Sequence, residues 1–220
     1  MIAMILAAGL GERMMPLTKN TPKPLIEVKG IKLIEHSINA LKKAEITDIV
    51  INISYLGEQI KSYLGNGKKF GVSITYSNES EGALGTAGGI IKVLPSLGEK
   101  PFIVINSDVL CEYDLSKLKL PIGSLAHLVL VDNPKHNQNG DFSLANEHQI
   151  INSTTKNYTF SGIGIYHPNL FKAHKNTKGK LPLYPIFKEA IINVQLSGEY
   201  FDGIWQDVGT PERLELANNS

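Results

Sequence analysis

The sequence predicts a single α/β domain in which a mainly parallel, mixed sheet lies between two layers of helices. An apolar run from Ile2 to Ala8 has the composition of a strand buried on both faces of a parallel sheet. An amphipathic segment over 31–44 and a second apolar run over 48–54 follow it, giving the order strand, helix, strand. A further β-branched run over 102–106 ends on polar residues, as strands of open α/β sheets do where ligands bind. These observations predict a Rossmann-like, three-layer α/β/α fold.

The other elements of the first half are shorter. A short helix is expected over 56–64 and an alternating strand over 72–76. A glycine-rich turn over 81–89 then leads into a short apolar helix that ends at Leu94.

The second half has longer strands and fewer helices, so we expect it to extend the first sheet as a mixed sheet. The expected elements are strands over 124–132, 158–167 and 200–208, a hairpin made of 140–146 and 148–152, and helices over 183–194 and 211–218.

Length and composition favour one domain and exclude several classes of partner. The 220 residues are 42% hydrophobic, enough for a substantial core, and no low-complexity linker divides them. A net charge of +1 without a basic tract argues against nucleic acid. The single cysteine, Cys111, can form neither an intramolecular disulfide nor a cysteine metal site. The first apolar run breaks at Gly9 and lacks a basic flank, so we expect a cytoplasmic protein with no membrane partner.

The stretch that follows the first strand has the composition of a phosphate-binding loop. Gly9 and Gly11 let the backbone turn sharply and bring its N–H groups against an anion, and Arg13 and Lys23 supply cations. A Walker A loop is excluded by the spacing, and Met14 stands where the dinucleotide fingerprint needs a third glycine. The alternative is an ordinary glycine-containing turn with a surface lysine.

Three prolines, at positions 16, 22 and 24, shape the rest of this stretch. Proline fixes φ and removes an N–H group, so we expect a stiff, extended loop that presents Lys23 and not a helix.

The pattern G-x-G-x-R-M-x-P-L-T, followed by T-P-K-P, resembles the signature of the sugar-1-phosphate nucleotidylyltransferases. Members of this family make a nucleotide sugar and pyrophosphate from a nucleoside triphosphate and a sugar 1-phosphate. The resemblance implies the nucleotide-diphospho-sugar transferase fold, with a nucleotide-binding half over 1–110 and a sugar-binding half over 111–220. It implies catalytic roles for Arg13, Lys23 and Asp108. It also implies that UTP or another nucleoside triphosphate contacts Ala7, Ala8, Gly9, Gly11, Arg13 and Lys23.

Two aspartates, Asp108 and Asp207, each end a short apolar run, in N-S-D-V and W-Q-D-V-G-T. Two carboxylates with waters and phosphate oxygens suit Mg²⁺, which prefers hard oxygen ligands. A single aspartate in such a position more often caps a turn. The family's magnesium aspartates occupy these two motifs, so the resemblance implies that Asp108 and Asp207 hold Mg²⁺.

The resemblance also implies where the base and the sugar bind. The glycine-rich turn faces the nucleobase in the family, which makes Gly85 and Thr86 candidates, together with Glu81. The alternative is a turn that only starts a helix. The E-K-P segment with which many relatives approach the sugar phosphate is absent, so the sugar-contact candidates are Asn106, Asp141, Ser161 and Gly162.

Further motifs are similar to one branch of the family, which transfers UMP from UTP to N-acetylmuramate 1-phosphate in bacterial peptidoglycan recycling. They are H-L-V-L-V-D-N-P with G-D-F-S-L within 127–144 and F-S-G-I at 160–163. The 134–142 segment offers Lys135 and His136 to the carboxylate of muramate.

Two features keep alternatives open. N-S-D stands where the family usually has N-G-D, and L-G-T-A-G-G is also common among guanylyl- and thymidylyltransferases. Mannose 1-phosphate with GTP, or glucose 1-phosphate with UTP or dTTP, are therefore alternative pairs. A non-catalytic nucleotide-sugar-binding subunit is a third alternative, which the retained metal pair disfavours.

Overall fold

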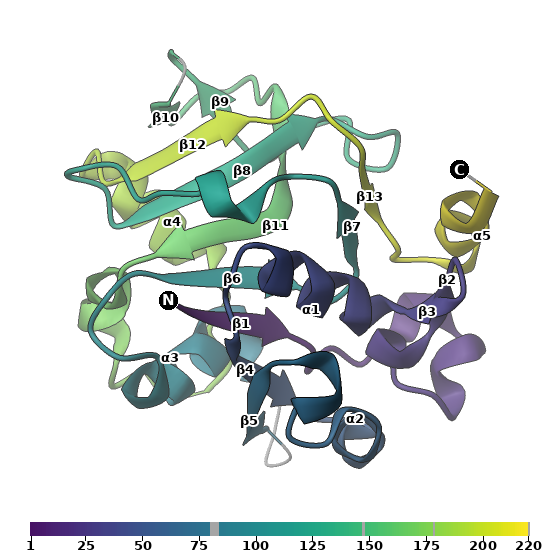
Figure 1. The fold of residues 1–220 in the computed structure, drawn as a ribbon. Helices are drawn as coiled ribbons and strands as arrows, with labels where there is room; N and C mark the ends of the chain where they lie inside the picture. Colours follow the sequence, from purple (N-terminus) through teal and green to yellow (C-terminus); the bar gives the residue numbers. More distant parts are fainter. Residues whose placement is uncertain (80–83, 147, 178, 220) are drawn as a thin grey trace.

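A seven-stranded sheet forms the central layer of the computed structural model, which describes residues 1–79, 84–146, 148–177 and 179–219 (Figure 1). All neighbouring strands are parallel except at β11, which runs antiparallel to both of its neighbours. The predicted mainly parallel, mixed sheet is therefore confirmed. In spatial order the strands are β12 (Leu196–Tyr200), β8 (Ala126–Asp132), β11 (Tyr158–Tyr166), β6 (Phe102–Asn106), β1 (Ile2–Leu6), β4 (Asp48–Ile53) and β5 (Ser73–Asn78).

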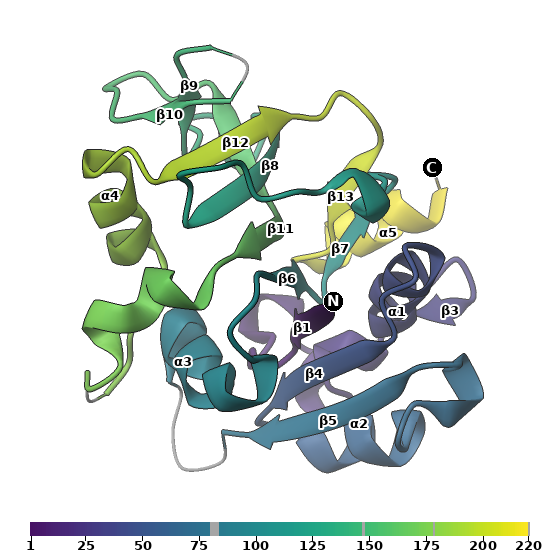
Figure 2. The ribbon, with the colours of Figure 1, turned by 60° about the vertical axis from the view of Figure 1, so that its left-hand side comes forward.

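Helices cover both faces of the sheet (Figures 1 and 2). The apolar sides of α1 (Leu33–Lys43) and α2 (Gly57–Leu64) pack on one face, and those of α3 (Gly85–Leu97) and α4 (Tyr184–Ile192) pack on the other. This arrangement confirms the three-layer prediction. Among the described residues, no helix is both long enough and apolar enough to cross a membrane.

The strand β1 shows why its sequence is apolar on both sides. Ala3 and Ile5 belong to the core beneath α1, whereas Met4 belongs to the core beneath α3. All three are fully buried, and burial of one large aliphatic side chain contributes about 1.5–3 kcal/mol. A continuous apolar run is therefore what a central strand of this sheet requires.

The prediction of an extended loop after β1 is wrong. Three single-turn 3₁₀ helices follow instead, η1 (Glu12–Met14), η2 (Leu17–Lys19) and η3 (Lys23–Leu25). The carbonyls of Pro16 and Pro22 accept the N–H groups of Lys19 and Leu25, so each proline stands just before a 3₁₀ turn, where its missing N–H group is not needed. A small hairpin that was not predicted, β2 (Glu27–Val28) with β3 (Ile31–Lys32), leads into α1 and takes the first two residues of the predicted helix.

The strand predicted over 200–208 is shorter than expected and lies outside the main sheet, because the segment holds only the last residue of β12 and the three residues of β13 (Trp205–Asp207). The main-sheet strand β12 ends at Tyr200, and β13 pairs antiparallel with β7 (Val109–Cys111) away from the main sheet (Figures 1 and 2). Neither β7 nor β12 was predicted. We refer to the β7 and β13 pair as the β7–β13 ribbon.

The remaining elements adjust the predicted bounds. The helix α3 continues past Leu94 to Leu97 and ends at Gly98, whose φ is +80°. The predicted hairpin is confirmed but is shorter, with β9 (Ser143–Leu144) and β10 (Ile150–Ile151). The chain also forms α5 (Pro211–Asn219), which lies beside β2, and three more 3₁₀ helices, η4 (Lys68–Phe70), η5 (Leu115–Lys117) and η6 (Pro168–His174).

Candidate active site

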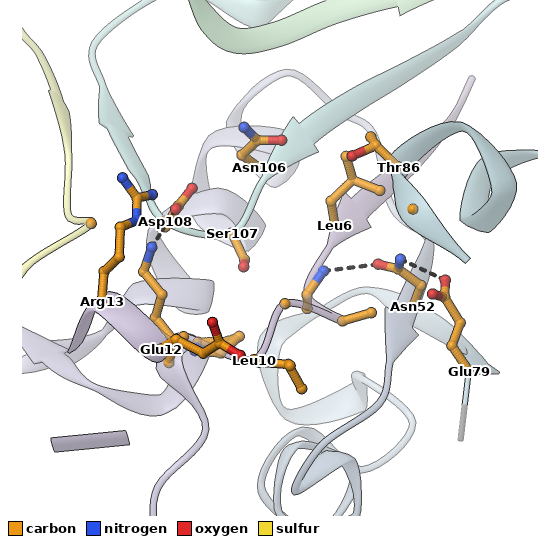
Figure 3. Close-up of a pocket in the computed structure, with 18 of the residues that line it drawn as sticks. Leu6, Leu10, Glu12, Arg13, Asn52, Glu79, Thr86, Asn106, Ser107 and Asp108 are labelled. Carbon is orange, nitrogen blue, oxygen red and sulfur yellow. Dashed lines mark hydrogen bonds and ion pairs between the residues drawn. The ribbon is translucent and has the colours of Figure 1, made fainter. Parts of the chain in front are cut away.

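The carboxyl ends of β1, β4 and β6 meet at one edge of the sheet and border a cavity of about 650 Å³, here called the first cavity (Figure 3). It contains most of the residues predicted to bind nucleotide or to act in catalysis. Glu81 lies outside the described residues. The first cavity is lined by residues 6–13, Lys23, Pro24, Asn52, Glu79, Gly85, Thr86, residues 106–108, Lys180 and Gly209.

Gly9 and Gly11 serve this cavity in different ways. Gly11 has φ +68°, and a Cβ there would lie 2.9 Å from Cγ2 of Thr18, whose hydroxyl donates to the Gly11 carbonyl. Gly11 is therefore required by the fold of the loop. A Cβ on Gly9 would meet no atom within 4 Å, so its absence leaves open space in the cavity wall.

Lys23 and Asp108 form an ion pair at one end of the first cavity. Lys23 comes from η3 and Asp108 follows β6, and their side chains are only 12% and 25% exposed. Figure 3 shows Arg13 toward the same end as Asp108, and Thr86 toward the opposite end. The structure thus brings together the three residues predicted to be catalytic.

The β7–β13 ribbon places Asp207, the last residue of β13, beside the start of β7, which Asp108 directly precedes. Asp207 is opposite Val109, and the Val208 N–H donates to the Asp108 carbonyl at 2.8 Å. Asp207 lines a second cavity and not the first. Its Oδ1 contacts Arg213 Nη1 at 2.9 Å and His136 Nε2 at 3.0 Å.

The donor set fits Mg²⁺. Within the described parts of the chain, no group of three or more His, Cys, Asp or Glu side chains is arranged to hold a metal. Mg²⁺ usually takes only one or two carboxylates and fills its other positions with waters and substrate phosphate oxygens. The ion pairs use Oδ2 of Asp108 and Oδ1 of Asp207, so a cation bound here would take the second oxygen of each carboxylate.

The second cavity also measures about 650 Å³ and shares Arg13 with the first. Its wall carries Lys135 and His136, the two residues expected to face an anion, and adds Arg213 from α5. The complete lining is Arg13, residues 131–136, 201–203 and 205–207, Thr210, Arg213 and Leu216.

Asn52 and Glu79 line the first cavity and were not predicted. The Ala7 N–H donates to Asn52 Oδ1, and Asn52 Nδ2 donates to Glu79 Oε1, each at 2.8 Å (Figure 3). Glu79 is only 4% exposed, and burial raises the pKa of its carboxyl group. The chain of bonds fixes the backbone at the end of β1. Asn52 stands inside the otherwise apolar run of β4, and this polar residue was the sequence feature that could have indicated a role at the site.

The start of α3 is held by a segment from the second half. A Cβ on Gly85 would lie 2.6 Å from the Leu181 carbonyl oxygen, and Gly85 has φ +73°. That carbonyl accepts the N–H groups of Ala87 and Gly88, which satisfies donors that a helix start leaves unpaired. Lys180, which was not predicted, is thereby placed in the first cavity, near Gly85 and Thr86.

The predicted sugar-contact residues are only partly brought together. Asn106 lines the first cavity, and a Cβ on Gly162 would lie 2.7 Å from its Nδ2. Ser161 is fully buried, and its hydroxyl accepts the Ile163 N–H while its carbonyl accepts Trp205 Nε1. Asp141 accepts the Phe160 N–H and lines neither of the two cavities.

Comparisons with known proteins agree with this geometry. The sequence model of the nucleotidyl transferase family, NTP_transferase, matches residues 2–220. The N-acetylmuramate alpha-1-phosphate uridylyltransferase of Neisseria meningitidis is 46% identical over 99% of this chain and 96% of that protein. The mannose-1-phosphate guanyltransferase of Saccharomyces cerevisiae is 34% identical over 96% of this chain, which spans 62% of that longer protein.

Solved structures show the same fold. A Bacillus anthracis protein assigned as a glucose-1-phosphate thymidylyltransferase superposes with a TM-score of 0.87 at 27% identity, covering all of this chain and 94% of that one. A UDP-glucose pyrophosphorylase bound to UDP-glucose superposes with a TM-score of 0.82 at 17% identity, over 99% of this chain and 97% of that one, and supports the fold alone. The family match and the relatives show that this chain belongs to the nucleotidyl transferase family and is a sugar-1-phosphate nucleotidyltransferase.

Proposed function

We propose that this enzyme transfers UMP from UTP to N-acetylmuramate 1-phosphate, giving UDP-N-acetylmuramate and pyrophosphate. The observation that carries the proposal is the pair of cavities that share Arg13. One holds the glycine loop, and in the wall of the other Lys135, His136 and Arg213 stand beside Asp132, Asp202 and Asp207. The 46% identity to a uridylyltransferase with this acceptor supports the same pair of substrates. The reaction belongs to the recycling of peptidoglycan, and its place is the cytoplasm.

The reaction asks for little covalent chemistry from the protein. The acceptor phosphate has its second pKa at about 6, so near pH 7 it is already a nucleophile. One of its oxygens attacks the α-phosphorus of UTP in line, a P–O bond forms, and the bond to pyrophosphate breaks. Catalysis then consists of holding the two substrates in line and offsetting negative charge.

Arg13 and Lys23 are the cations assigned to the triphosphate. Phosphate oxygens entering the first cavity compete with Asp108 for Lys23, so the ion pair seen here separates as the nucleotide binds. The backbone N–H groups of the 7–11 loop face the same phosphates. Mg²⁺ on Asp108 and Asp207, when bound, offsets charge on the reacting phosphates.

The half over 1–110 is assigned to the nucleotide. Thr86 lies toward the end of the first cavity away from Arg13, and its chain neighbour Gly85 lines the same cavity, which suits the nucleobase. The half over 111–220 is assigned to the sugar, with Asp141, Ser161 and Gly162 as its contacts and Asn106, from the end of β6 in the first half, as a fourth contact.

The choice of acceptor rests on charge. Muramate differs from glucosamine by a lactyl ether with a carboxylate, and a buried carboxylate without a partner is costly. Lys135 lines the second cavity and offers such a partner, while His136 and Arg213, which line it too, are held on Asp207 Oδ1.

A grid of four nucleoside triphosphates against several sugar 1-phosphates, with pyrophosphate release as the readout, tests the proposal. We expect the highest kcat/KM for UTP with N-acetylmuramate 1-phosphate and much lower values for glucosamine and glucose 1-phosphates. A higher value for GTP with mannose 1-phosphate, the reaction named in the guanyltransferase relatives, would replace the proposed pair while keeping the reaction class.

A further inference from the structure

Arginine is rare in this chain, and both copies lie in the same place. Of 22 lysine and arginine residues only Arg13 and Arg213 are arginines, and both line the second cavity. Arg13 belongs to the family signature, whereas nothing in the sequence motifs assigns a role to Arg213. Arginine presents donors in a rigid planar fork that lysine cannot reproduce, so its selective use here points to a geometric role.

The guanidinium of Arg213 is seated tightly against the end of the β7–β13 ribbon. Its side chain, from the first turn of α5, is 15% exposed, and Nη1 donates to Asp207 Oδ1 at 2.9 Å. A Cβ on Gly209 would lie 2.0 Å from Nη2, so the absent side chain of Gly209 makes the slot that the guanidinium occupies. The buried Nε has no hydrogen-bond partner among the described residues. The hydrogen bond to Asp207 comes from Nη1, while Nη2 lies against Gly209.

This contact sets the orientation of the Asp207 carboxylate. Arg213 and His136 both hold Oδ1, which leaves Oδ2 as the oxygen for a cation. A Cβ on Gly209 would lie 3.2 Å from that Oδ2, and Gly209 lines the first cavity. Oδ2 thus lies next to Gly209, a residue of the first cavity that contains Asp108, although Asp207 itself lines the second cavity.

We propose that Arg213 is a positioning residue, which holds Asp207 so that Oδ2 faces the metal site. The inference rests on the proposed function, because it takes Asp108 and Asp207 as the metal pair. Groups that orient a metal ligand are worth roughly 10- to 100-fold in metal affinity when they are removed. Arg213 acts through Asp207 and needs no contact with either substrate.

The test measures metal binding directly. Mn²⁺ is titrated into the protein, and free Mn²⁺ is followed by electron paramagnetic resonance, for the wild type, Arg213→Gln and Arg213→Lys. We expect the Mn²⁺ dissociation constant of Arg213→Gln to rise roughly 10- to 100-fold. Arg213→Lys keeps the positive charge but loses the planar guanidinium, so its Mn²⁺ dissociation constant should lie between those of the wild type and Arg213→Gln. It also provides the test if Arg213→Gln does not fold.

Asn218→Ala is the matched control. Its amide oxygen accepts the Lys29 N–H and fastens α5 to the turn after β2, without touching Asp207. We expect this variant to unfold at a lower temperature and to bind Mn²⁺ like the wild type. Equal weakening of Mn²⁺ binding in Asn218→Ala, or unchanged binding in both Arg213 variants, would show that Arg213 only anchors the helix and would overturn the proposal.

Asp207→Asn separates this inference from the proposed reaction. If it binds Mn²⁺ as tightly as the wild type, Asp207 is not a metal ligand and the positioning role is overturned. Pyrophosphate release by the wild-type enzyme, measured alongside with Mg²⁺, UTP and N-acetylmuramate 1-phosphate, shows independently whether the proposed reaction stands.

Discussion

Replacing Arg13 or Lys23 by alanine shows whether these two cations bind the triphosphate or are ordinary surface charges. We expect Arg13→Ala and Lys23→Ala each to cost about 2–4 kcal/mol of transition-state stabilisation, the scale of a lost preorganised charge contact. The measurement is kcat/KM for UTP. Lys19→Ala is the control, because this exposed lysine of η2 lines neither of the two cavities. Loss of thermal stability with unchanged kcat/KM would make Arg13 and Lys23 ordinary surface charges.

Gly9 and Gly11 form a second matched pair at this scale. In Gly11→Ala the side chain meets Thr18 and the residue keeps a left-handed φ, so we expect a loss of about 1–3 kcal/mol in the free energy of unfolding. Gly9→Ala has room for its methyl group and should unfold like the wild type, but the added Cβ occupies the cavity wall. Urea denaturation and the KM for UTP separate the two effects. Equal stability of both variants would contradict this account of the loop.

The sequence was most informative for residues whose roles are encoded locally. Arg13, Lys23 and the loop glycines stand in one short motif, and the structure gathers them in one cavity. The partners of Asp207 could not be predicted, since His136 and Arg213 come from distant segments and converge only after folding. Arg213 still left a signal, because arginine is so rare in the chain.

At the scale of elements, the bonds from Ala7 through Asn52 to Glu79 join β1, β4 and the end of β5. Burial raises the pKa of Glu79, so the folded state binds its proton more tightly than the unfolded state. The stability gained from Glu79 is full below its ordinary pKa of 4.5 and is lost as pH rises through the raised pKa.

Glu79→Gln tests this pH dependence of stability directly, because glutamine keeps an oxygen that accepts from Asn52 and never ionises. The melting temperature of the variant minus that of the wild type should increase from pH 4 to pH 7. Glu199→Gln is the opposite-sign control. A hydrogen bond with His127 is the main cause that lowers the pKa of Glu199, so its charge stabilises the fold above 4.5. A difference for Glu79→Gln that stays flat with pH would contradict the burial argument.

Long, strongly patterned elements were predictable and short ones were not. The central strands β1, β4 and β6 have apolar runs that identify them without tertiary information. The ribbon strands β7 and β13 have three residues each and pair across 94 or more positions, so no local period marks them. The strand that carries Asp207 was expected, but its separation from the main sheet depends on a partner that the local sequence does not specify.

At the scale of the whole molecule, the ribbon joins the two halves at the site. Asp108 comes directly after β6, a strand of the first half. Asp207 comes from the second half: after β12 the chain leaves the main sheet, and β13, which ends at Asp207, pairs with β7. The fold thus brings the backbone at Asp108 into contact with Val208, next to Asp207, although the two aspartates lie about a hundred positions apart in the chain. This meeting of the halves is the structural basis for assigning one metal site to Asp108 and Asp207.

Mg²⁺-dependent pyrophosphate release by Asp108→Asn and Asp207→Asn, with UTP and N-acetylmuramate 1-phosphate, tests that assignment most directly. Asparagine keeps the shape of the side chain and loses the charge that holds the metal. Each variant should keep the wild-type fold, checked by its melting temperature, and lose roughly 100-fold or more in turnover. Near-wild-type turnover by either variant would remove that aspartate from the metal site and contradict the account of how the two halves form one active site.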